Sequence, residues 1–501
     1  MAVWLNDAIR GLIKRLLPLA GRIARRELNL SLARYPRRQA ELRALYGITD
    51  QTPILDYAGT RPHLEAFAAG RDDVFFAETS GSTGDPKRIP YTPDRVRRFK
   101  VQSRDAGLRA FVHFGAQRPE LFVFAGLQKD RSFSSLVLHD GGAKPGYLAG
   151  LTEPARYLRH PAVREASRVH GTTAARVFLL ALSNPCVLYS TNPSTLAVFL
   201  TEVQGQWPDA TGLVRAYLAG RHPKLDAVIK RVGRAGWRRR FVEIDASTDA
   251  LPLHRWAPDV HAFCCWDGGY VGPFLAQIRR SLPHGRYVHI PMYAMSTETV
   301  ETLPARGPRG LSFLPISADV LYEFLPVHAP DDAARLRLPS EVAVGDEVCM
   351  VVSDRYGLRR YQTEDVFECV AKVGGLPDLR FRRRRGLTWS FTGEKLTAAQ
   401  LSPVFDLLRE QHPSLSDVPL SCLPSQPAGG LPGYVLLAAA PNPPRTLASD
   451  FDAALSRRNG EYRDKRARRF WFSRTDSSTS MTGGMYIFST EPRVQSRWII
   501  L

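Results

Sequence analysis

The spacing of apolar residues along this chain changes repeatedly between a helical and an extended pattern. Helical spacing covers Trp4–Leu30, Pro93–Phe114, Thr172–Leu182, Pro193–Gln204 and Val271–Leu282. Short apolar runs typical of buried strands lie at Val74–Ala77, Leu121–Phe124, Cys186–Tyr189, Ala262–Trp266 and Tyr287–Pro291. Strands that alternate with helices predict a parallel or mixed sheet with helices on its faces. We therefore expect an α/β fold, in which ligands bind outside the carboxyl ends of the strands.

Turn-forming residues give the expected limits of several helices. Residues 1–70 are predicted to be helices that cover the following domain, with a break at Pro36 and another near Gly47. The helix that begins at Pro193 has Thr191 or Asn192 as its N-cap. Two further helices are expected before Gly236, and residues 126–160 are rich in loops.

The length of 501 residues allows two domains. We predict a large N-terminal domain over residues 1–385, with mixed sheets and flanking helices. A smaller, mobile C-terminal α+β domain is expected over residues 386–501, with helices near Ala398–Gln411 and Leu447–Tyr462.

A loop of small hydroxyl residues and glycines follows the apolar run Val74–Ala77. Its residues are Thr79, Ser80, Gly81, Ser82, Thr83, Gly84, Asp85, Pro86 and Lys87. Glycine lets backbone N–H groups approach an anion closely, and the hydroxyls and the lysine add donors and positive charge. The loop has no G-x-x-x-x-G-K-[ST] spacing, so it is not a Walker A loop. It is suited to binding a polyphosphate, and the alternative is an ordinary surface turn.

The chain is strongly basic, with 68 Lys and Arg against 49 Asp and Glu and a net charge of +19. This balance suits anionic substrates such as ATP and carboxylates. Nucleic-acid binding would rest on charge alone, because no supporting motif is present, and we expect none. The six cysteines have apolar neighbours and form no C-x-x-C pair, which indicates reduced core residues of a cytoplasmic protein.

The basic, amphipathic N-terminal segment is not a signal peptide, and its longest uncharged run is too short to span a bilayer. We expect no stable membrane insertion. Such a helix can lie on a membrane surface, but it more often covers the core of its own domain.

The loop at residues 79–87 resembles the Thr-Ser-Gly-Thr-Thr-Gly-x-Pro-Lys phosphate loop of adenylate-forming enzymes, with Ser82 in place of one threonine. These enzymes activate a carboxylate with ATP as an acyl-AMP. A second segment, Met292–Glu298, is similar to their Tyr-x-x-[Ser/Thr]-Glu motif. The resemblance implies that Ser296 and Thr297 lie at the nucleotide, and that Glu298 holds Mg²⁺. It implies that Tyr293 stacks on adenine, although Tyr293 is one residue too far from Glu298 and Ala294 is the alternative.

Three later segments narrow the resemblance to the acyl-acid amido synthetases, known from auxin and jasmonate conjugation in plants. Gly310–Pro315 and Leu321–Pro326 resemble two strands of that family, and Tyr356–Asp365 resembles its Gly-Leu-Tyr-Arg-Tyr-Arg-x-Gly-Asp segment. Glu364 stands where the family has glycine. The resemblance implies that Asp365 accepts hydrogen bonds from the ribose hydroxyls. It also implies that Arg384, or its neighbour Arg383, contacts the nucleotide.

The resemblance implies a ligase that uses ATP and Mg²⁺, with Lys87, Glu298 and Arg384 in catalytic roles. It would join a carboxylic acid to an amine, expected to be an amino acid. Thr490 stands where the family has a C-terminal lysine, so an impaired nucleotide-binding homologue is one alternative. An acyl-CoA ligase that uses the same intermediate is another. The acyl acid and the oligomeric state are not specified by the sequence.

Overall fold

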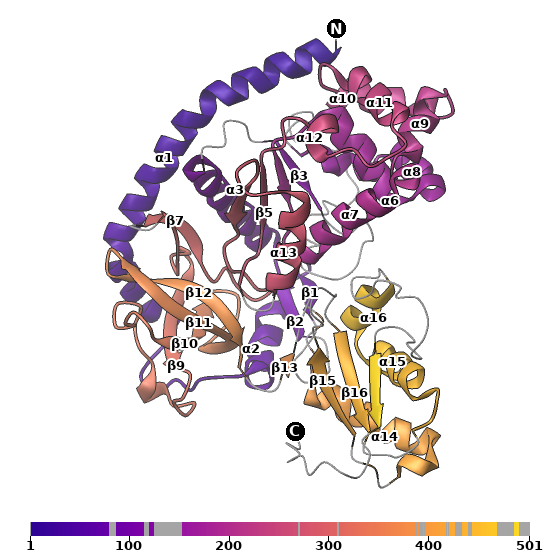
Figure 1. Ribbon diagram of the computed structural model, residues 1–501. Helices are drawn as coiled ribbons and strands as arrows, with labels where there is room; N and C mark the ends of the chain where they lie inside the picture. Colours follow the sequence, from indigo (N-terminus) through magenta and orange to yellow (C-terminus); the bar gives the residue numbers. More distant parts are fainter. Residues whose placement is uncertain are drawn as a thin grey trace. The chain divides into compact units, whose positions relative to one another are not determined.

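The computed structural model describes residues 2–79, 87–114, 120–124, 153–268, 271–307, 310–385, 388–389, 394, 396–416, 418, 420–425, 433–438, 443–467 and 485–489 (Figure 1). Their contacts divide the chain into two compact units. The first unit holds residues 1–77 and 89–383, and the second holds residues 78–88 and 384–501. The second unit resumes at Arg384, next to the predicted division after residue 385. The mobility of the C-terminal domain stays a prediction.

A long helix, α1 (Ala2–Leu45), runs along the outside of the first unit, and α2 (Tyr57–Ala68) follows it (Figure 1). The predicted break near Gly47 is confirmed, but the predicted break at Pro36 is wrong, because the helix continues through it. A proline inside a helix removes one backbone hydrogen bond. Buried contacts on both sides compensate for that loss here, since Tyr35 donates to the Pro315 carbonyl at 2.7 Å and Gln39 donates to the Val320 carbonyl at 3.0 Å.

Four parallel strands form the central sheet of the first unit in the order β3-β4-β5-β6. Their bounds are β3 (Leu121–Val123), β4 (Val187–Tyr189), β5 (Ala262–Cys265) and β6 (Val288–Pro291). The main helices between them are α3 (Pro93–His113), α6 (Pro161–Ser183), α7 (Pro193–Gly205) and α13 (Gly272–Ser281). Every residue of β5 is buried, as expected for a strand covered on both faces. The predicted α/β fold is confirmed.

Asn192 is the N-cap of α7, and its side chain accepts a hydrogen bond from the Ser194 N–H at 3.1 Å. The short 3₁₀-helix η1 (Pro154–Arg159) precedes α6. After α7 come the short helices α8 (Trp207–Ala210), α9 (Gly212–Leu218), η2 (Pro223–Leu225), α10 (Asp226–Val232), α11 (Trp237–Ala246) and α12 (Leu253–Trp256). Three α-helices therefore precede Gly236 where two were expected. The extra one is the single turn of α8, too short to leave a periodic pattern.

An antiparallel sheet in the order β12-β11-β10-β9 forms the other large layer of the first unit. Its strands are β9 (Val320–Pro326), β10 (Glu347–Asp354), β11 (Tyr361–Val373) and β12 (Leu376–Arg384), and a hairpin of β7 (Leu303–Gly307) and β8 (Gly310–Leu314) precedes them. The 3₁₀-helix η4 (Ala333–Arg335) lies between β9 and β10. Val352 faces Tyr322 of β9 on one side and Tyr361, the first residue of β11, on the other.

The strand before the predicted phosphate loop, β1 (Phe75–Thr79), pairs with β2 (Lys87–Tyr91) in a two-stranded sheet of their own. The run Val74–Ala77, which the alternating pattern grouped with the strands of a parallel or mixed sheet, is therefore not part of the parallel sheet. The segment that does follow a parallel strand is the one after β6, which carries Glu298. Ligands of α/β sheets bind outside the carboxyl ends of the strands, and the segment with Glu298 is the predicted motif that follows such an end.

The second unit contains β13 (Thr388–Trp389) paired with β14 (Leu396–Thr397), and a sheet in the order β15-β16-β17. The strands of that sheet are β15 (Leu420–Ser425), β16 (Gly433–Ala438) and β17 (Met485–Ser489), with β16 and β17 parallel. Its helices are α14 (Ala398–Gln411), η5 (Pro413–Leu415), α15 (Leu447–Arg458) and α16 (Gly460–Ala467). Asn459 separates the last two helices, where the sequence predicted one.

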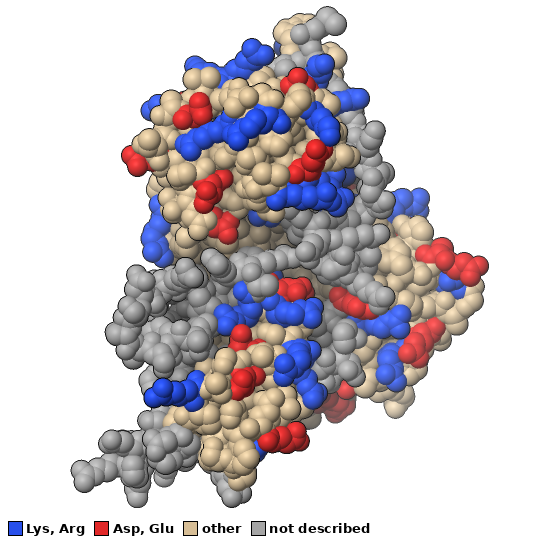
Figure 2. Space-filling model, turned by 90° about the vertical axis from the view of Figure 1, so that its right-hand side faces the viewer, with Lys and Arg blue, Asp and Glu red and all other residues tan. Residues whose placement is uncertain are grey.

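Three features considered from composition are the cysteines, membrane-spanning helices and the distribution of charge on the surface. All six cysteines are buried, and none of them forms a disulfide. Among the described residues, no helix is long and apolar enough to cross a membrane. On the described part of the face drawn in Figure 2, Lys and Arg side chains are interspersed with Asp and Glu rather than gathered into one basic stripe.

Candidate active site

A tight turn after β6 carries Glu298. Met295 and Val300 form an antiparallel bridge, and the Ser296 N–H donates to the Thr299 carbonyl at 2.9 Å. The Thr299 N–H in turn donates to the Ser296 hydroxyl at 3.3 Å. These bonds place Thr297 and Glu298 together at the end of the turn, so local hydrogen bonding alone brings three of the predicted site residues into one short loop.

The carboxylate of Glu298 is buried, since the residue is 6% exposed, and it accepts a hydrogen bond from the Tyr361 hydroxyl at 3.0 Å. Tyr361 is fully buried at the first position of β11. A buried carboxylate needs donors to offset the loss of water. The bond occupies one carboxylate oxygen and restricts the rotation of the side chain, and it joins two of the motifs identified in the sequence.

Arg95 of α3 holds the backbone of the same turn. Its Nη2 donates to the Glu298 carbonyl at 2.5 Å and its Nη1 donates to the Pro90 carbonyl at 2.8 Å. The guanidinium lies over the rings of Tyr91 and Tyr356, at 4.6 and 4.8 Å from their centroids. A planar cation that stacks between two rings keeps a defined orientation. Arg95 therefore connects α3 to the turn that carries Glu298.

Asp354 at the end of β10 is the acidic partner of Arg95, with Nη2 at 3.3 Å from its Oδ2. Its Oδ1 accepts from the backbone N–H groups of Tyr356 and Leu358 at 2.7 and 3.1 Å. Burial raises the pKa of Asp354, while Arg95 and the two backbone bonds act in the opposite direction. Three donors on one buried carboxylate fit its ionised form.

A second buried ion pair positions the start of β11. Arg360 donates from Nε and Nη2 to the two carboxylate oxygens of Glu323, each at 2.8 Å. Its Nη1 donates to the Thr52 carbonyl at 2.6 Å, and its backbone has φ of +42°. A non-glycine residue in this region is strained and persists only when its surroundings fix it. The two-bond contact with Glu323 does so, and it sets the position of the adjacent Tyr361.

Asp365 lies on a β-bulge four residues further along β11. The register of β10 and β11 shifts between Cys349 and Val351, and the residues of β11 left over opposite that shift are Thr363, Glu364 and Asp365. Glu364 has φ of +64°, and the Asp365 N–H donates to the Thr363 hydroxyl at 3.2 Å. The family motif has glycine at position 364, and the left-handed backbone explains that preference. The bulge turns the half-buried Asp365 away from the regular ladder.

Tyr293 lies in the apolar core rather than on an open surface. It is 7% exposed, its hydroxyl donates to the Ser103 hydroxyl at 2.8 Å, and burial raises its pKa to about 12. Ala294, the alternative position for the family tyrosine, is also buried, and its N–H donates to the Thr302 hydroxyl at 2.9 Å. The role of Tyr293 in adenine stacking stays a prediction.

The remaining predicted residues belong to segments that the structure describes in part. Ser80, Gly81, Ser82, Thr83 and Gly84 lie outside the described residues, as does Thr490, and Thr79 is described as the last residue of β1. Lys87 is the buried first residue of β2. Arg383 pairs with Glu347 at 2.7 Å, and Arg384 is the last residue of β12. Arg384 stays the predicted nucleotide contact, with Arg383 as the alternative.

Sequence reasoning missed Arg95, Tyr91 and Asp354. Tyr91 donates from its hydroxyl to the Thr297 carbonyl at 2.7 Å, so it supports the same turn as Arg95. Tyr91 is the last residue of strand β2 and Arg95 lies in the first turn of α3, and neither position carries a local signal for a role at residues 297 and 298. Only the packing of α3 against the turn reveals it.

Part of this chain is similar to a known protein family. Residues 313–384 match the GH3 family central domain, which corresponds to the end of β8 and the sheet β9–β12. Indole-3-acetic acid-amido synthetase GH3.3 of Arabidopsis thaliana is 28% identical over 127 residues, which are 24% of this chain and 21% of that protein. Putative indole-3-acetic acid-amido synthetase GH3.10 of Oryza sativa subsp. japonica is 33% identical over 98 residues, 20% of each. The matches span about a fifth of these relatives.

Comparison with solved structures covers most of the chain. The acyl acid amido synthetase AtGH3.15, in complex with 2,4-DB, has a TM-score of 0.51 and 16% sequence identity, over 93% of this chain and 86% of that chain. At this level of sequence identity, the structural similarity shows a shared fold alone. The resemblance found in the sequence is confirmed: residues 313–384 are similar to the GH3 family central domain, and the fold of the chain is similar to that of an acyl acid amido synthetase.

Proposed function

We propose that this chain is an ATP-dependent ligase that activates a carboxylic acid as an acyl-AMP and transfers the acyl group to an amine, expected to be an amino acid. The observation that carries the proposal is the hydrogen bond from Tyr361 to the buried carboxylate of Glu298. It joins a residue of the GH3 family central domain to the turn that the family resemblance assigns to the metal and the nucleotide.

In the first step, a carboxylate oxygen of the acid attacks the α-phosphorus of ATP. The bond from that phosphorus to the bridging oxygen breaks, and pyrophosphate leaves. We assign Lys87 and the hydroxyl and backbone N–H groups of residues 79–84 to the phosphates, where they stabilise the developing negative charge. Asp365 is assigned to the ribose hydroxyls, and Arg384 to the nucleotide.

The residues of the turn suit Mg²⁺. Mg²⁺ is usually bound by one or two protein carboxylates together with phosphate oxygens of the substrate. Glu298 offers one carboxylate, which Tyr361 orients, and the described residues contain no cluster of three or more His, Cys, Asp or Glu. Glu298 would hold the ion, which neutralises phosphate charge when bound.

In the second step, the amine nitrogen attacks the carbonyl carbon of the acyl-AMP. The bond from that carbon to the phosphate oxygen breaks, AMP leaves, and the nitrogen loses a proton to water. No enzyme thiol takes part in this scheme. The buried positions of the cysteines agree with that, because burial raises the pKa of Cys264, Cys265 and Cys422 and keeps them as thiols.

The decisive experiment is exchange of labelled pyrophosphate into ATP across a panel of carboxylic acids. Acid-dependent exchange supports acyl-AMP formation, and its absence with every acid favours a non-catalytic nucleotide-binding homologue. That alternative is based on Thr490, which stands where the family has its C-terminal lysine. The last lysine in the sequence is Lys465, which lies on α16 and pairs with Glu461 at 3.9 Å. We propose that Lys87 supplies the missing cation.

The acceptor is tested by supplying the active acid with either amino acids or coenzyme A. Amide formation without coenzyme A supports the proposal, whereas thioester formation identifies an acyl-CoA ligase. We propose a cytoplasmic enzyme whose partners are its small-molecule acid and amine. Binding of nucleic acid would show itself as an affinity that falls steeply with salt, and we expect none.

A further inference from the structure

The helix α1 presents an apolar face to solvent along its first thirty residues. Its members are Leu5, Leu12, Leu16, Leu19, Ile23 and Leu30, and each is between 47% and 58% exposed. At 100° per residue they fall within about 60° around the helix axis. Isolated exposed leucines are common, but a continuous row of them marks an interaction surface.

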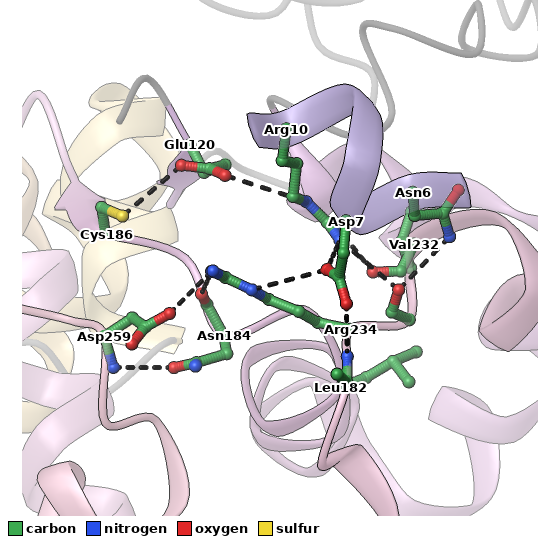
Figure 3. Close-up of polar contacts among 12 residues, drawn as sticks. Asn6, Asp7, Arg10, Glu120, Leu182, Asn184, Cys186, Val232, Arg234 and Asp259 are labelled. Atoms are coloured by element: carbon green, nitrogen blue, oxygen red, sulfur yellow. Dashed lines mark hydrogen bonds and ion pairs between the residues drawn. The ribbon is translucent and has the colours of Figure 1, made fainter. Parts of the chain in front are cut away.

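The opposite edge of the helix is attached to the first unit. Near its start, Arg10 donates to the Val232 carbonyl at 2.9 Å and Asn6 donates to the Gly233 carbonyl at 3.2 Å (Figure 3). Asp7 accepts from the Ala235 N–H at 3.0 Å. Further along, Leu17 and Leu28 are buried. These contacts fix which side of α1 faces the solvent, so the apolar face is held outward and does not fold back onto the unit.

Basic residues border the apolar face on one side. Lys14, Arg15, Arg22, Arg25 and Arg26 are all exposed, and among the described residues none of them forms an ion pair. Residues 8–26 contain no Asp or Glu. Around the helix, the buried edge, the basic side chains and the apolar face follow one another in that order. The first half of the helix thus combines exposed apolar area with uncompensated positive charge.

We infer that α1 binds the surface of an anionic lipid bilayer, with the leucine face among the acyl chains and the basic side chains at the headgroups. Exposed apolar area next to Lys and Arg is the composition of interfacial helices. A second copy of the chain is a poorer partner, because pairing two such helices brings their basic flanks together and like charges repel. This inference does not rest on the proposed function.

The test is flotation with vesicles of phosphatidylcholine alone and of phosphatidylcholine with phosphatidylglycerol in equal parts. We expect the intact protein to float with the anionic vesicles at low salt and to dissociate as salt is raised. The triple variant L12E/L19E/I23E should lower the bound fraction at least about tenfold. The triple variant R15Q/R22Q/R26Q should lower the vesicle-binding constant by about fivefold for each charge removed.

Matched controls carry the same changes outside α1. V169E/V242E/V344E alters three exposed valines, and R168Q/R239Q/R280Q alters three exposed arginines. Both should float as the unchanged protein does, and thermal unfolding should show that all four variants fold. Equal binding to neutral vesicles, or equal loss in the controls, overturns the inference. So does a dimer in light scattering that L12E/L19E/I23E converts to a monomer, which would make this face a contact between two copies.

Discussion

Glu298 and Asp365 are both carboxylates in the first unit, but they are held in different ways. Glu298 is buried, and side chains from two other elements contact its turn, with Tyr361 on the carboxylate and Arg95 on the carbonyl. Asp365 is half-buried, and a backbone bulge places it. A buried carboxylate depends on hydrogen-bond donors of the protein to replace water, whereas a half-buried carboxylate keeps part of its hydration. Mutations of supporting residues should therefore affect the Glu298 turn more strongly than the Asp365 bulge.

The largest effect is expected from Arg95→Ala. It leaves the Asp354 carboxylate buried without its cation, and breaking such a pair costs about 3 to 5 kcal/mol. Chemical unfolding measures the loss. Arg97→Ala on the same helix is the control, because the exposed Arg97–Asp94 pair should contribute less than about 0.5 kcal/mol. Arg95→Ala combined with Asp354→Asn should recover part of the stability, and no recovery would show that the charge pair is not the cause.

Glu298→Gln removes the charge but keeps the shape and an acceptor for Tyr361. If Glu298 holds Mg²⁺, acid-dependent pyrophosphate exchange should fall about a hundredfold to a thousandfold, with the unfolding free energy nearly unchanged. Glu341→Gln at an exposed site is the control. A decrease of less than about threefold would exclude a direct role for this carboxylate in the charged transition state.

Asp365→Asn weakens a charged acceptor at the proposed ribose position. Hydrogen bonds to a charged group contribute about 1.5 to 3 kcal/mol, so the KM for ATP should rise about tenfold or more while kcat changes less. Steady-state kinetics with varied ATP distinguish the two parameters. The control is Glu368→Gln on the same strand, and an equal rise there would contradict a specific contact at Asp365.

Tyr361→Phe removes one hydrogen bond from Glu298 and leaves the ring in the core. A hydrogen bond to a charged carboxylate contributes about 1.5 to 3 kcal/mol, so exchange should fall about tenfold or more. The Mg²⁺ concentration for half-maximal rate should rise as well, because the carboxylate loses its orientation. Tyr356→Phe removes a hydroxyl that bonds to Asp94 instead, and it should leave the Mg²⁺ requirement unchanged.

The smallest effect is expected from Glu364→Gly, which restores the residue of the family motif. Relief of the left-handed backbone at φ of +64° should stabilise the fold by about 0.5 to 1 kcal/mol. The control is Glu368→Gly, which lies in extended strand and pairs with Arg382, and it should destabilise the fold. If both substitutions destabilise equally, the bulge is not strained.

Several elements could be predicted closely because their signals are local. The helix Pro93–Phe114 and the strand Cys186–Tyr189 follow from apolar spacing, and side-chain chemistry limits the N-cap of α7 to Thr191 or Asn192, of which the structure uses Asn192. Pro36 shows the limit of such reasoning, because proline is unfavourable inside a helix and only the burial of Tyr35, Gln39 and Leu42 keeps α1 continuous. The strand before the phosphate loop shows another, because the sequence does not tell which strand it pairs with.

The sequence by itself determined the element types, the α/β class and the segments that carry Glu298, Asp365 and Arg384, since each depends on neighbours along the chain. The tertiary structure alone decided that Tyr361 contacts Glu298, 63 residues away, and that Arg95 holds the same turn across 203 residues. It also decided which face of α1 stays in solvent. Such contacts depend on how whole elements pack, and packing is set by the combined shape and burial of many side chains rather than by any single stretch.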